Sequence, residues 1–216
     1  MPPRAAGARA PLPLLIGFAG FLVVLAFLVI SPLMRPRVPT FAPEAGRAAR
    51  ADPSGGAIDT ITVDARDEGV WQWVDLSRGA VLQPPDTAGW DLAFRRFHVI
   101  AAQGVVDAGG VSFERAAPAP GVAAVPTRFT SDTVNPAIDR WYRYNFLTHL
   151  LVPRGSRYLI QVRGGHWVKL EFLSYYCSGP SAGCVTFRYA FLPGARPPAS
   201  SERPALGQSD EYEAPP

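Results

Sequence analysis

The stretch Arg157–Phe191, RYLIQVRGGHWVKLEFLSYYCSGPSAGCVTFRYAF, contains three strand-like runs in succession. The first two runs, Arg157–Arg163 and Trp167–Tyr176, are rich in aromatic and β-branched residues and flank Gly164-Gly165. Paired glycines readily adopt the positive φ angles that a tight hairpin turn requires. In the third run, Cys184–Phe191, large apolar side chains recur at every second position, as in a strand with one buried face. The stretch therefore predicts consecutive antiparallel strands.

Shorter runs of the same kind occur upstream, and turn residues separate them. We interpret five such runs as strands: Ile58–Asp64, Val70–Leu76, Trp90–Ile100, Val111–Arg115 and Arg140–Phe146. No stretch after residue 35 keeps the 3.6-residue period of an amphipathic helix. The fold class predicted for this part of the chain is an all-β antiparallel sandwich or a partly closed barrel.

The two cysteines of the chain, Cys177 and Cys184, bracket the turn-rich segment SGPSAG between two predicted strands. This spacing suits a disulfide that closes a hairpin. Disulfides persist in oxidising compartments, so the pair favours a location outside the cytoplasm. The alternative is that both residues are reduced and act as small apolar side chains.

The segment Leu14–Ile30, LLIGFAGFLVVLAFLVI, carries no charge and is long enough to cross most of a bilayer. With its flanking prolines it predicts a transmembrane helix over residues 11–34. The alternative is a cleaved signal peptide, whose apolar core is normally shorter. Three small residues, Gly17, Ala19 and Gly20, offer one patch where another helix can pack closely.

The predicted organisation has five parts. These are a short N-terminal segment (1–10), the transmembrane helix (11–34), a linker (35–57), a β domain (58–192) and a Pro-rich acidic tail (193–216). Basic residues flank the helix almost evenly, so charge alone does not orient it. The cysteine pair leads us to place residues 35–216 outside the cytoplasm.

Composition and motifs exclude several functional classes. A formal net charge of +3 over 216 residues does not indicate a nucleic-acid partner. The sequence has no nucleophile elbow, P-loop, dinucleotide fingerprint or zinc-hydrolase motif, and its three histidines lack metal-ligand spacing. We expect no enzyme, no cofactor and no metal, and we interpret Asp91 as a partner of Arg95 or Arg96 at a sheet end.

Four blocks of the sequence resemble the HmuY family of bacterial extracytoplasmic β proteins. They are Thr60–Leu76 with Gly79, Trp90–His98, Trp141–Arg163, and Lys169–Tyr176 with Val185–Tyr189. Their order and spacing are similar to those of the family, and they cover most of residues 58–192. The resemblance implies an HmuY-like, mostly β, non-catalytic domain tethered outside the inner membrane. With the apolar helix and the cysteine pair, it leads us to expect a single-pass protein of the bacterial inner membrane with most of the chain on the periplasmic side. Haem capture is the best-known activity of such domains.

The resemblance also implies where haem ligands would stand, and this chain departs from the pattern there. In haem-binding members one axial ligand follows the Trp that matches Trp141, and that position here is Phe146. The other ligand comes from an insertion that Arg128–Arg140 replaces, without His or Met. If haem binds, the candidate ligands are therefore His149 and His98.

Two functions follow as expectations. The first is a non-enzymatic accessory or structural subunit that stabilises an integral-membrane assembly in the lipid bilayer, such as a photosynthetic reaction centre–antenna or respiratory complex. Its candidate interface is the aromatic and basic run Trp141, Tyr142, Arg143 and Tyr144. The alternative is a haem- or tetrapyrrole-binding carrier or receptor of the HmuY type.

Overall fold

The structure is a computed structural model that describes residues 11–33, 37–43, 56–84, 87–129, 133–179 and 181–194. The chain divides into two compact units, residues 1–37 and 38–216. The predicted N-terminal segment (1–10), most of the predicted linker and nearly all of the predicted tail lie outside the described residues.

The first unit contains the helix α1, Leu12–Leu33, close to the predicted range 11–34. Within it, Leu12–Ser31 is long and apolar enough to cross a membrane, with a mean hydropathy of 2.8. Its apolar side chains are exposed along the whole span, which is the expected state of a membrane or leader segment outside lipid. Among the described residues, no atom of a neighbouring element lies within 4 Å of where a Cβ on Gly17 or Gly20 would stand, so the role of the small-residue patch in helix packing stays a prediction.

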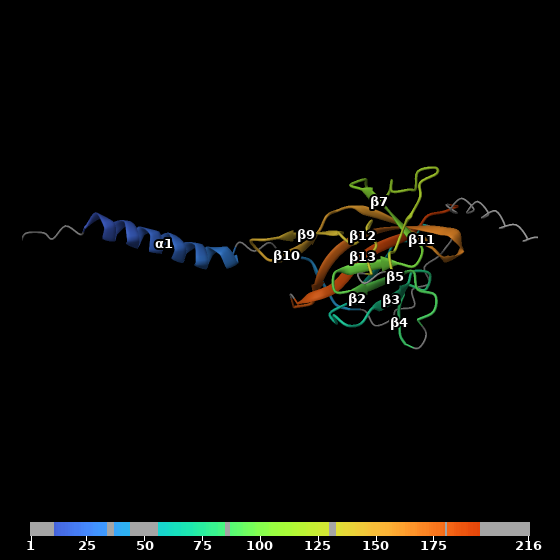
Figure 1. The fold of residues 1–216 in the computed structure, drawn as a ribbon, viewed down its shortest axis with the longest axis horizontal. Helices are drawn as coiled ribbons and strands as arrows, with labels where there is room; N and C mark the ends of the chain where they lie inside the picture. Colours follow the sequence, from blue (N-terminus) through green and yellow to red (C-terminus); the bar gives the residue numbers. More distant parts are fainter. Residues whose placement is uncertain are drawn as a thin grey trace, which may run out of the picture. The chain divides into compact units, whose positions relative to one another are not determined.

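The second unit is built around a seven-stranded sheet (Figure 1). Its central strands are β11 (Arg157–Val162), β12 (His166–Cys177) and β13 (Ala182–Phe191), which pair antiparallel in sequence order. The sheet is completed by β1 (Thr40–Phe41), β2 (Asp59–Asp64), β7 (Gly104–Gly109) and β8 (Val125–Pro126). The Arg157–Phe191 stretch thus forms the middle of the sheet, as its apolar alternation predicted.

A four-stranded sheet and a separate hairpin complete the unit. The smaller sheet has the order β4-β3-β5-β6, formed by Ala80–Leu82, Gln72–Asp75, Leu92–Arg95 and His98–Ala101. It contributes to one apolar core with the larger sheet, and Phe94 stacks on Phe187 with ring centroids 5.3 Å apart. The hairpin consists of β9 (Tyr142–Asn145) and β10 (Leu150–Pro153), and it projects beyond the end of the larger sheet (Figure 1). The predicted all-β antiparallel fold after a single helix is confirmed.

Several local predictions need correction. The run Trp90–Ile100 is not one strand, because the chain reverses at Arg96, whose φ of 54° lies in the left-handed region, and so forms the β5–β6 hairpin. The run Val111–Arg115 is a turn, and the neighbouring strand is β7 instead. In contrast, Gly164 and Gly165 have φ angles of 78° and 77°, as a tight turn between β11 and β12 requires.

The predicted linker, residues 35–57, contains a strand that sequence alone did not indicate. Thr40 and Phe41 pair in parallel with Tyr176 and Cys177 of β12. The pairing of β11 with β12 ends at Glu171, so the last part of β12 has a free edge. The short β1 covers part of that edge and satisfies its backbone groups, which explains why an irregular sequence becomes ordered here.

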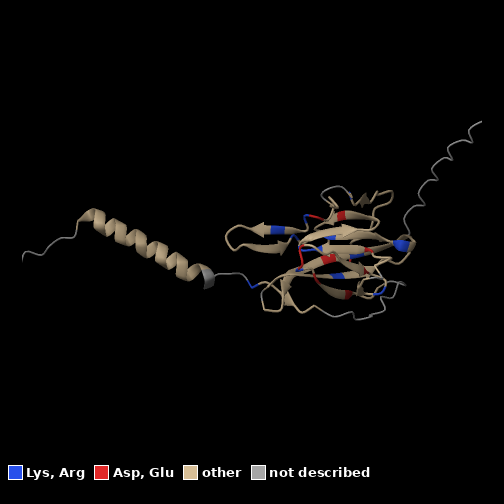
Figure 2. Cartoon of the chain, turned by 60° about the horizontal axis from the view of Figure 1, so that its bottom comes forward, with Lys and Arg blue, Asp and Glu red and all other residues tan. Residues whose placement is uncertain are grey.

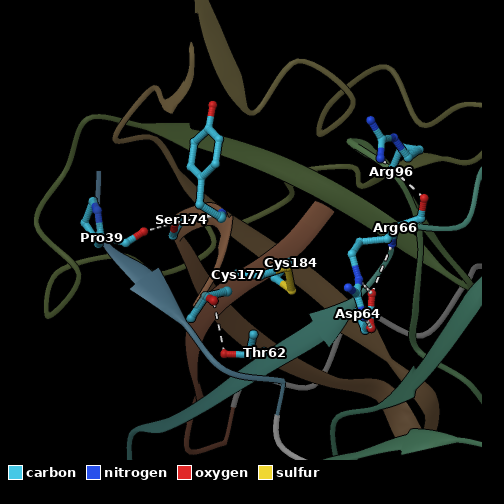
Figure 3. The surroundings of a disulfide bond; sticks show 10 residues. Pro39, Thr62, Asp64, Arg66, Arg96, Ser174, Cys177 and Cys184 are labelled. Atoms are coloured by element: carbon cyan, nitrogen blue, oxygen red, sulfur yellow. Dashed lines mark hydrogen bonds and ion pairs between the residues drawn. A yellow bond between two sulfur atoms is a disulfide. The ribbon is translucent and has the colours of Figure 1, made fainter. Parts of the chain in front are cut away.

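Cys177 and Cys184 form a disulfide between β12 and β13, with Cα atoms 4.9 Å apart (Figure 3). The bond closes the hairpin close to β1, because Phe41 of β1 pairs with Cys177. Nearby, the Ser174 hydroxyl donates a hydrogen bond to the Pro39 carbonyl just before β1. Both cysteines are nearly inaccessible to solvent. The disulfide therefore fastens the turn of the central hairpin next to β1.

Candidate ligand cleft beneath the β9–β10 hairpin

A cleft of about 370 Å³ lies where the β9–β10 hairpin leaves the larger sheet. We call it the hairpin cleft. Its volume falls in the range of small-molecule sites. The lining is mainly aromatic, with one guanidinium and one imidazole: Arg96, Phe97, Tyr142, Tyr144, His149, Leu151, Tyr175, Tyr176 and Ala182. Flat aromatic walls with a few polar groups suit a planar, partly polar ligand.

Phe97 forms part of the cleft wall, and Trp141 holds it in place. The Trp141 indole is 1% exposed and stacks on Phe172 with ring centroids 4.3 Å apart. Its Nε1–H donates a hydrogen bond of 2.8 Å to the Phe97 carbonyl. Phe97 in turn makes an edge contact with Tyr142 at 5.3 Å between centroids. The cleft wall is therefore connected to the core through buried, hydrogen-bonded packing.

The hydroxyl of Tyr175 is a polar group of the cleft with no hydrogen-bond partner among the described residues. Tyr175 is 1% exposed, and burial raises the pKa of its phenol. The positive charge of the nearby Arg96 guanidinium offsets part of that rise. Buried hydroxyls normally have a partner, because leaving one unpaired costs about 1–3 kcal/mol. The hydroxyl has no accessible surface, so a ligand oxygen or nitrogen would pair with it only after the side chains around it move.

His149 lines the hairpin cleft. It is the candidate ligand that is nearest in sequence to Phe146, the matched family position. Its φ of 55° is left-handed, and its Nδ1 is hydrogen-bonded to the Tyr144 hydroxyl at 2.5 Å. This bond leaves Nε2 as the ring nitrogen that is able to coordinate a metal. Phe146, which occupies the matched family position itself, is 78% exposed at the hairpin tip.

His98 belongs to a neighbouring cleft of about 390 Å³ that shares Arg96 and Phe97 with the hairpin cleft. Its Nδ1–H donates to the Asp139 carboxylate at 3.1 Å, an arrangement that fixes the ring and is common behind metal-binding histidines. The two candidate histidines thus line different clefts. In the part of the chain that the structure describes, no group of three or more His, Cys, Asp or Glu residues is arranged to hold a metal ion.

The predicted interface run is only partly at the surface. Trp141 is buried, so its assignment to an interface is wrong: its large ring fills the core where β9 begins. Tyr142 is half-buried in the cleft, whereas Arg143 and Tyr144 are exposed. Burial therefore falls along the run from the core at Trp141 to the exposed residues Arg143 and Tyr144.

Asp91 has a structural role, with a partner that differs from the predicted Arg95 or Arg96. It is 2% exposed, its Oδ2 accepts the Leu76 backbone N–H at 2.9 Å, and its Oδ1 lies 3.9 Å from Nε of Arg163. Arg163 also pairs with the buried Asp75 at 3.3 Å. Burial raises the pKa of Asp91. These groups tie the β11–β12 turn to the smaller sheet and line neither of the two clefts described above.

Sequence reasoning missed Arg96, Phe97 and Tyr175 as cleft residues. Phe97 and Tyr175 have the pattern of ordinary strand positions, and Arg96 is one of many arginines. The β5–β6 turn brings the first two residues to the end of β12, about eighty positions away in the sequence, where Tyr175 stands. No local pattern signals such a contact.

Comparison with solved structures identifies the class to which this fold belongs. A protein from Bacteroides vulgatus described as HmuY-like and heme-binding superimposes with a TM-score of 0.53 and 21% identity, over 68% of this chain and 97% of that one. The apo form of an HmuY analogue from Tannerella forsythia has a TM-score of 0.52 and 17% identity, over 63% and 96%. A protein from Bacteroides fragilis described as a lipoprotein has a TM-score of 0.52 and 18% identity, over 69% and 95%.

The β domain therefore has the HmuY-like fold, as the four sequence blocks predicted. The sequence matches no protein-family model, and no curated protein matches it. The likeness covers nearly all of each of these structures and about two thirds of this chain. It shows the fold of the domain, whereas the chemistry of the site depends on this chain's own residues.

Proposed function

We propose that this chain is a non-enzymatic, extracytoplasmic binding protein whose hairpin cleft takes up haem or a related tetrapyrrole. His149 would be the single axial ligand, through Nε2. The observation that carries the proposal is an aromatic cleft that contains an imidazole and a guanidinium, with the unpartnered Tyr175 hydroxyl buried in its wall. A tetrapyrrole with acidic side chains has a chemical match for each of these groups.

Each group of the cleft has a distinct contribution in this proposal. Phe97, Tyr142 and Tyr176 offer flat apolar surface to a macrocycle. The Arg96 guanidinium is suited to a carboxylate, although it already lies 3.6 Å from the exposed Glu68 carboxylate. His149 would coordinate iron with its free ring nitrogen while the Tyr144 hydroxyl keeps the ring oriented.

We assign one histidine and not two to the iron. His98 lines the neighbouring cleft, and Phe97 belongs to the wall of both clefts. The proposal is therefore five-coordinate binding, or a second ligand from outside the chain. The description of one structural neighbour as heme-binding supports haem as the first ligand to test.

Haem titration of the full chain in detergent tests the proposal. We expect a shifted Soret band with a one-to-one endpoint, lost in His149→Ala and kept in the matched control His98→Ala. Tyr175→Phe removes one hydroxyl without changing the ring, so it should weaken binding about fivefold, the equivalent of about 1 kcal/mol. No Soret shift in the unaltered chain, or an unchanged shift in His149→Ala, would refute it.

The iron-free porphyrin separates the cleft from the ligand histidine. If the cleft walls bind the macrocycle, protoporphyrin fluorescence should report binding to the His149→Ala variant as well as to the unaltered chain. Loss of porphyrin binding in that variant would show that His149 shapes the cleft and does not act as an iron ligand.

The location of the protein is part of the same proposal. The apolar α1 and the Cys177–Cys184 disulfide support a chain that is membrane-anchored or secreted into an oxidising compartment. A single-pass inner-membrane topology with a periplasmic β domain is our preferred form of it. The expectation of an accessory subunit in a photosynthetic or respiratory assembly rests on the helix and stays a prediction, as does the integral-membrane partner.

A further inference from the structure

The tip of the β9–β10 hairpin exposes large apolar side chains to solvent. Phe146 and Leu147 are 78% and 83% exposed, and Tyr144 beside them is 54% exposed. Residues of this kind are normally buried, and Leu147 is the most exposed large apolar residue described in the chain. The backbone of the turn is ordered, since the Asn145 side chain accepts the N–H groups of Leu147 and Thr148. The hairpin therefore presents a fixed apolar tip.

The charge around this tip is of one sign. Arg143 lies on β9, Arg140 and Arg154 stand at the base of the hairpin, and no acidic residue occurs between Asp139 and Glu171 in the sequence. Figure 2 shows basic and no acidic colour on the projecting hairpin. Aromatic and leucine side chains at an edge flanked by arginines are typical of segments that enter the headgroup region of an anionic bilayer. The Tyr144 ring, apolar with a polar end, suits the same depth.

One residue, Tyr176, contacts both the hairpin strand β10 and the first strand of the domain. The backbone of Tyr176 pairs with Thr40 of β1, and its hydroxyl accepts the Leu151 backbone N–H at 2.8 Å. The apolar helix ends at Leu33, only seven residues before Thr40. A fully extended chain of that length spans at most about 25 Å. A short segment of chain is therefore all that joins α1 to the strand that pairs with Tyr176.

We propose that the hairpin tip is a second membrane contact: Phe146 and Leu147 insert into the headgroup region of the anionic bilayer that holds α1. Arg143 on β9, with Arg140 and Arg154 at the base of the hairpin, binds the phospholipid phosphates. This contact restrains the β domain at the membrane surface through two points instead of one. It rests on α1 being membrane-embedded and is independent of any ligand in the hairpin cleft.

The test uses the full chain in nanodiscs that contain phosphatidylcholine and phosphatidylglycerol, without haem. Both native cysteines are joined in the disulfide, so Leu147→Cys adds a single thiol for an environment-sensitive fluorophore. Ile58→Cys is the matched control, because Ile58 is also an apolar residue that is 55% exposed. It comes just before Asp59 of β2, which pairs with Tyr189 of β13, and so it is not part of the hairpin. We expect a blue-shifted emission at position 147 that spin-labelled lipids quench several times more strongly than at position 58.

Charge supplies the second arm of the test. Arg140→Gln combined with Arg143→Gln leaves the apolar tip intact, and we expect it to reduce lipid quenching at position 147 in the anionic nanodiscs. Lipid quenching at position 147 should also be weaker in discs of phosphatidylcholine alone when both arginines are kept. Equal quenching at positions 147 and 58 would overturn the proposal. A blue shift without lipid quenching would also overturn it, because it would mean that protein and not lipid covers the tip.

Discussion

Replacing Trp141 with Phe should destabilise the β domain and disturb the hairpin cleft together. The change removes the Nε1–H that donates to the Phe97 carbonyl at 2.8 Å, worth about 1 kcal/mol. The smaller ring also lacks two carbons, and the gap left beside Phe172 is worth about 1.6 kcal/mol at ~0.8 kcal/mol per buried carbon group. We expect the free energy of unfolding to fall by about 2.5 kcal/mol, equivalent to about 5–10 °C in Tm for a chain of this size.

Far-UV circular dichroism of the full chain in detergent, followed through a denaturant titration, measures this change without depending on tryptophan emission. Trp73→Phe is the control, because Trp73 is only half-buried and contacts Trp90 on the smaller sheet. The control should lose clearly less stability. If Trp141→Phe changed the free energy of unfolding by less than about 0.5 kcal/mol, the size of a typical surface substitution, the inference that Trp141 anchors the cleft wall would be wrong.

Three further changes test other parts of the structure. Replacing both Cys177 and Cys184 with Ala should lower the free energy of unfolding by about 2.5 kcal/mol, because the bond closes a short loop in the unfolded chain; thermal melts with and without reductant check this. Burial raises the pKa of Asp91, so the folded state keeps this proton to a higher pH than the unfolded state does. The free energy of unfolding should therefore fall as pH rises from 3.8 through the raised pKa. Asp91→Asn should make the free energy of unfolding less dependent on pH, as measured by denaturation curves across that range. Gly164→Ala forces a side chain onto a φ of 78° and should cost about 1–2 kcal/mol, again by chemical denaturation, whereas an unchanged midpoint would contradict the turn assignment.

The elements that sequence predicted well are those whose signal is local. Burial alternates in β12 from Val168 to Ser174, because one face of that part of the strand packs on the core, and its period of two is visible in the residues themselves. The strands β11 and β13 are buried on both faces over most of their length. The turn at Gly164 and the helix α1 were equally clear, since a pair of glycines indicates positive φ angles and a long uncharged apolar run indicates a membrane-length helix. The disulfide follows from the same hairpin, because its two cysteines flank the turn.

The strands that sequence missed depend on pairing partners far along the chain. β1 becomes a strand because β12 extends past β11 and leaves an edge, and β7 because β11 needs a partner on its other side. Neither segment has a strong pattern of its own. The break of Trp90–Ile100 at Arg96 has the same origin, since a hairpin there lets both halves contribute to one sheet.

The sequence by itself determined that an uncharged apolar helix precedes an antiparallel β domain, because helix length, strand alternation and glycine turns are properties of neighbouring residues. Only the tertiary structure decided that Trp141 is a core residue, that His98 and His149 stand in separate clefts, and that Tyr175 and Phe97 share the hairpin cleft. Those facts depend on which strands meet in space. Side chains from strands distant in the sequence share a cleft only after sheet order and register are set, and no single segment encodes either.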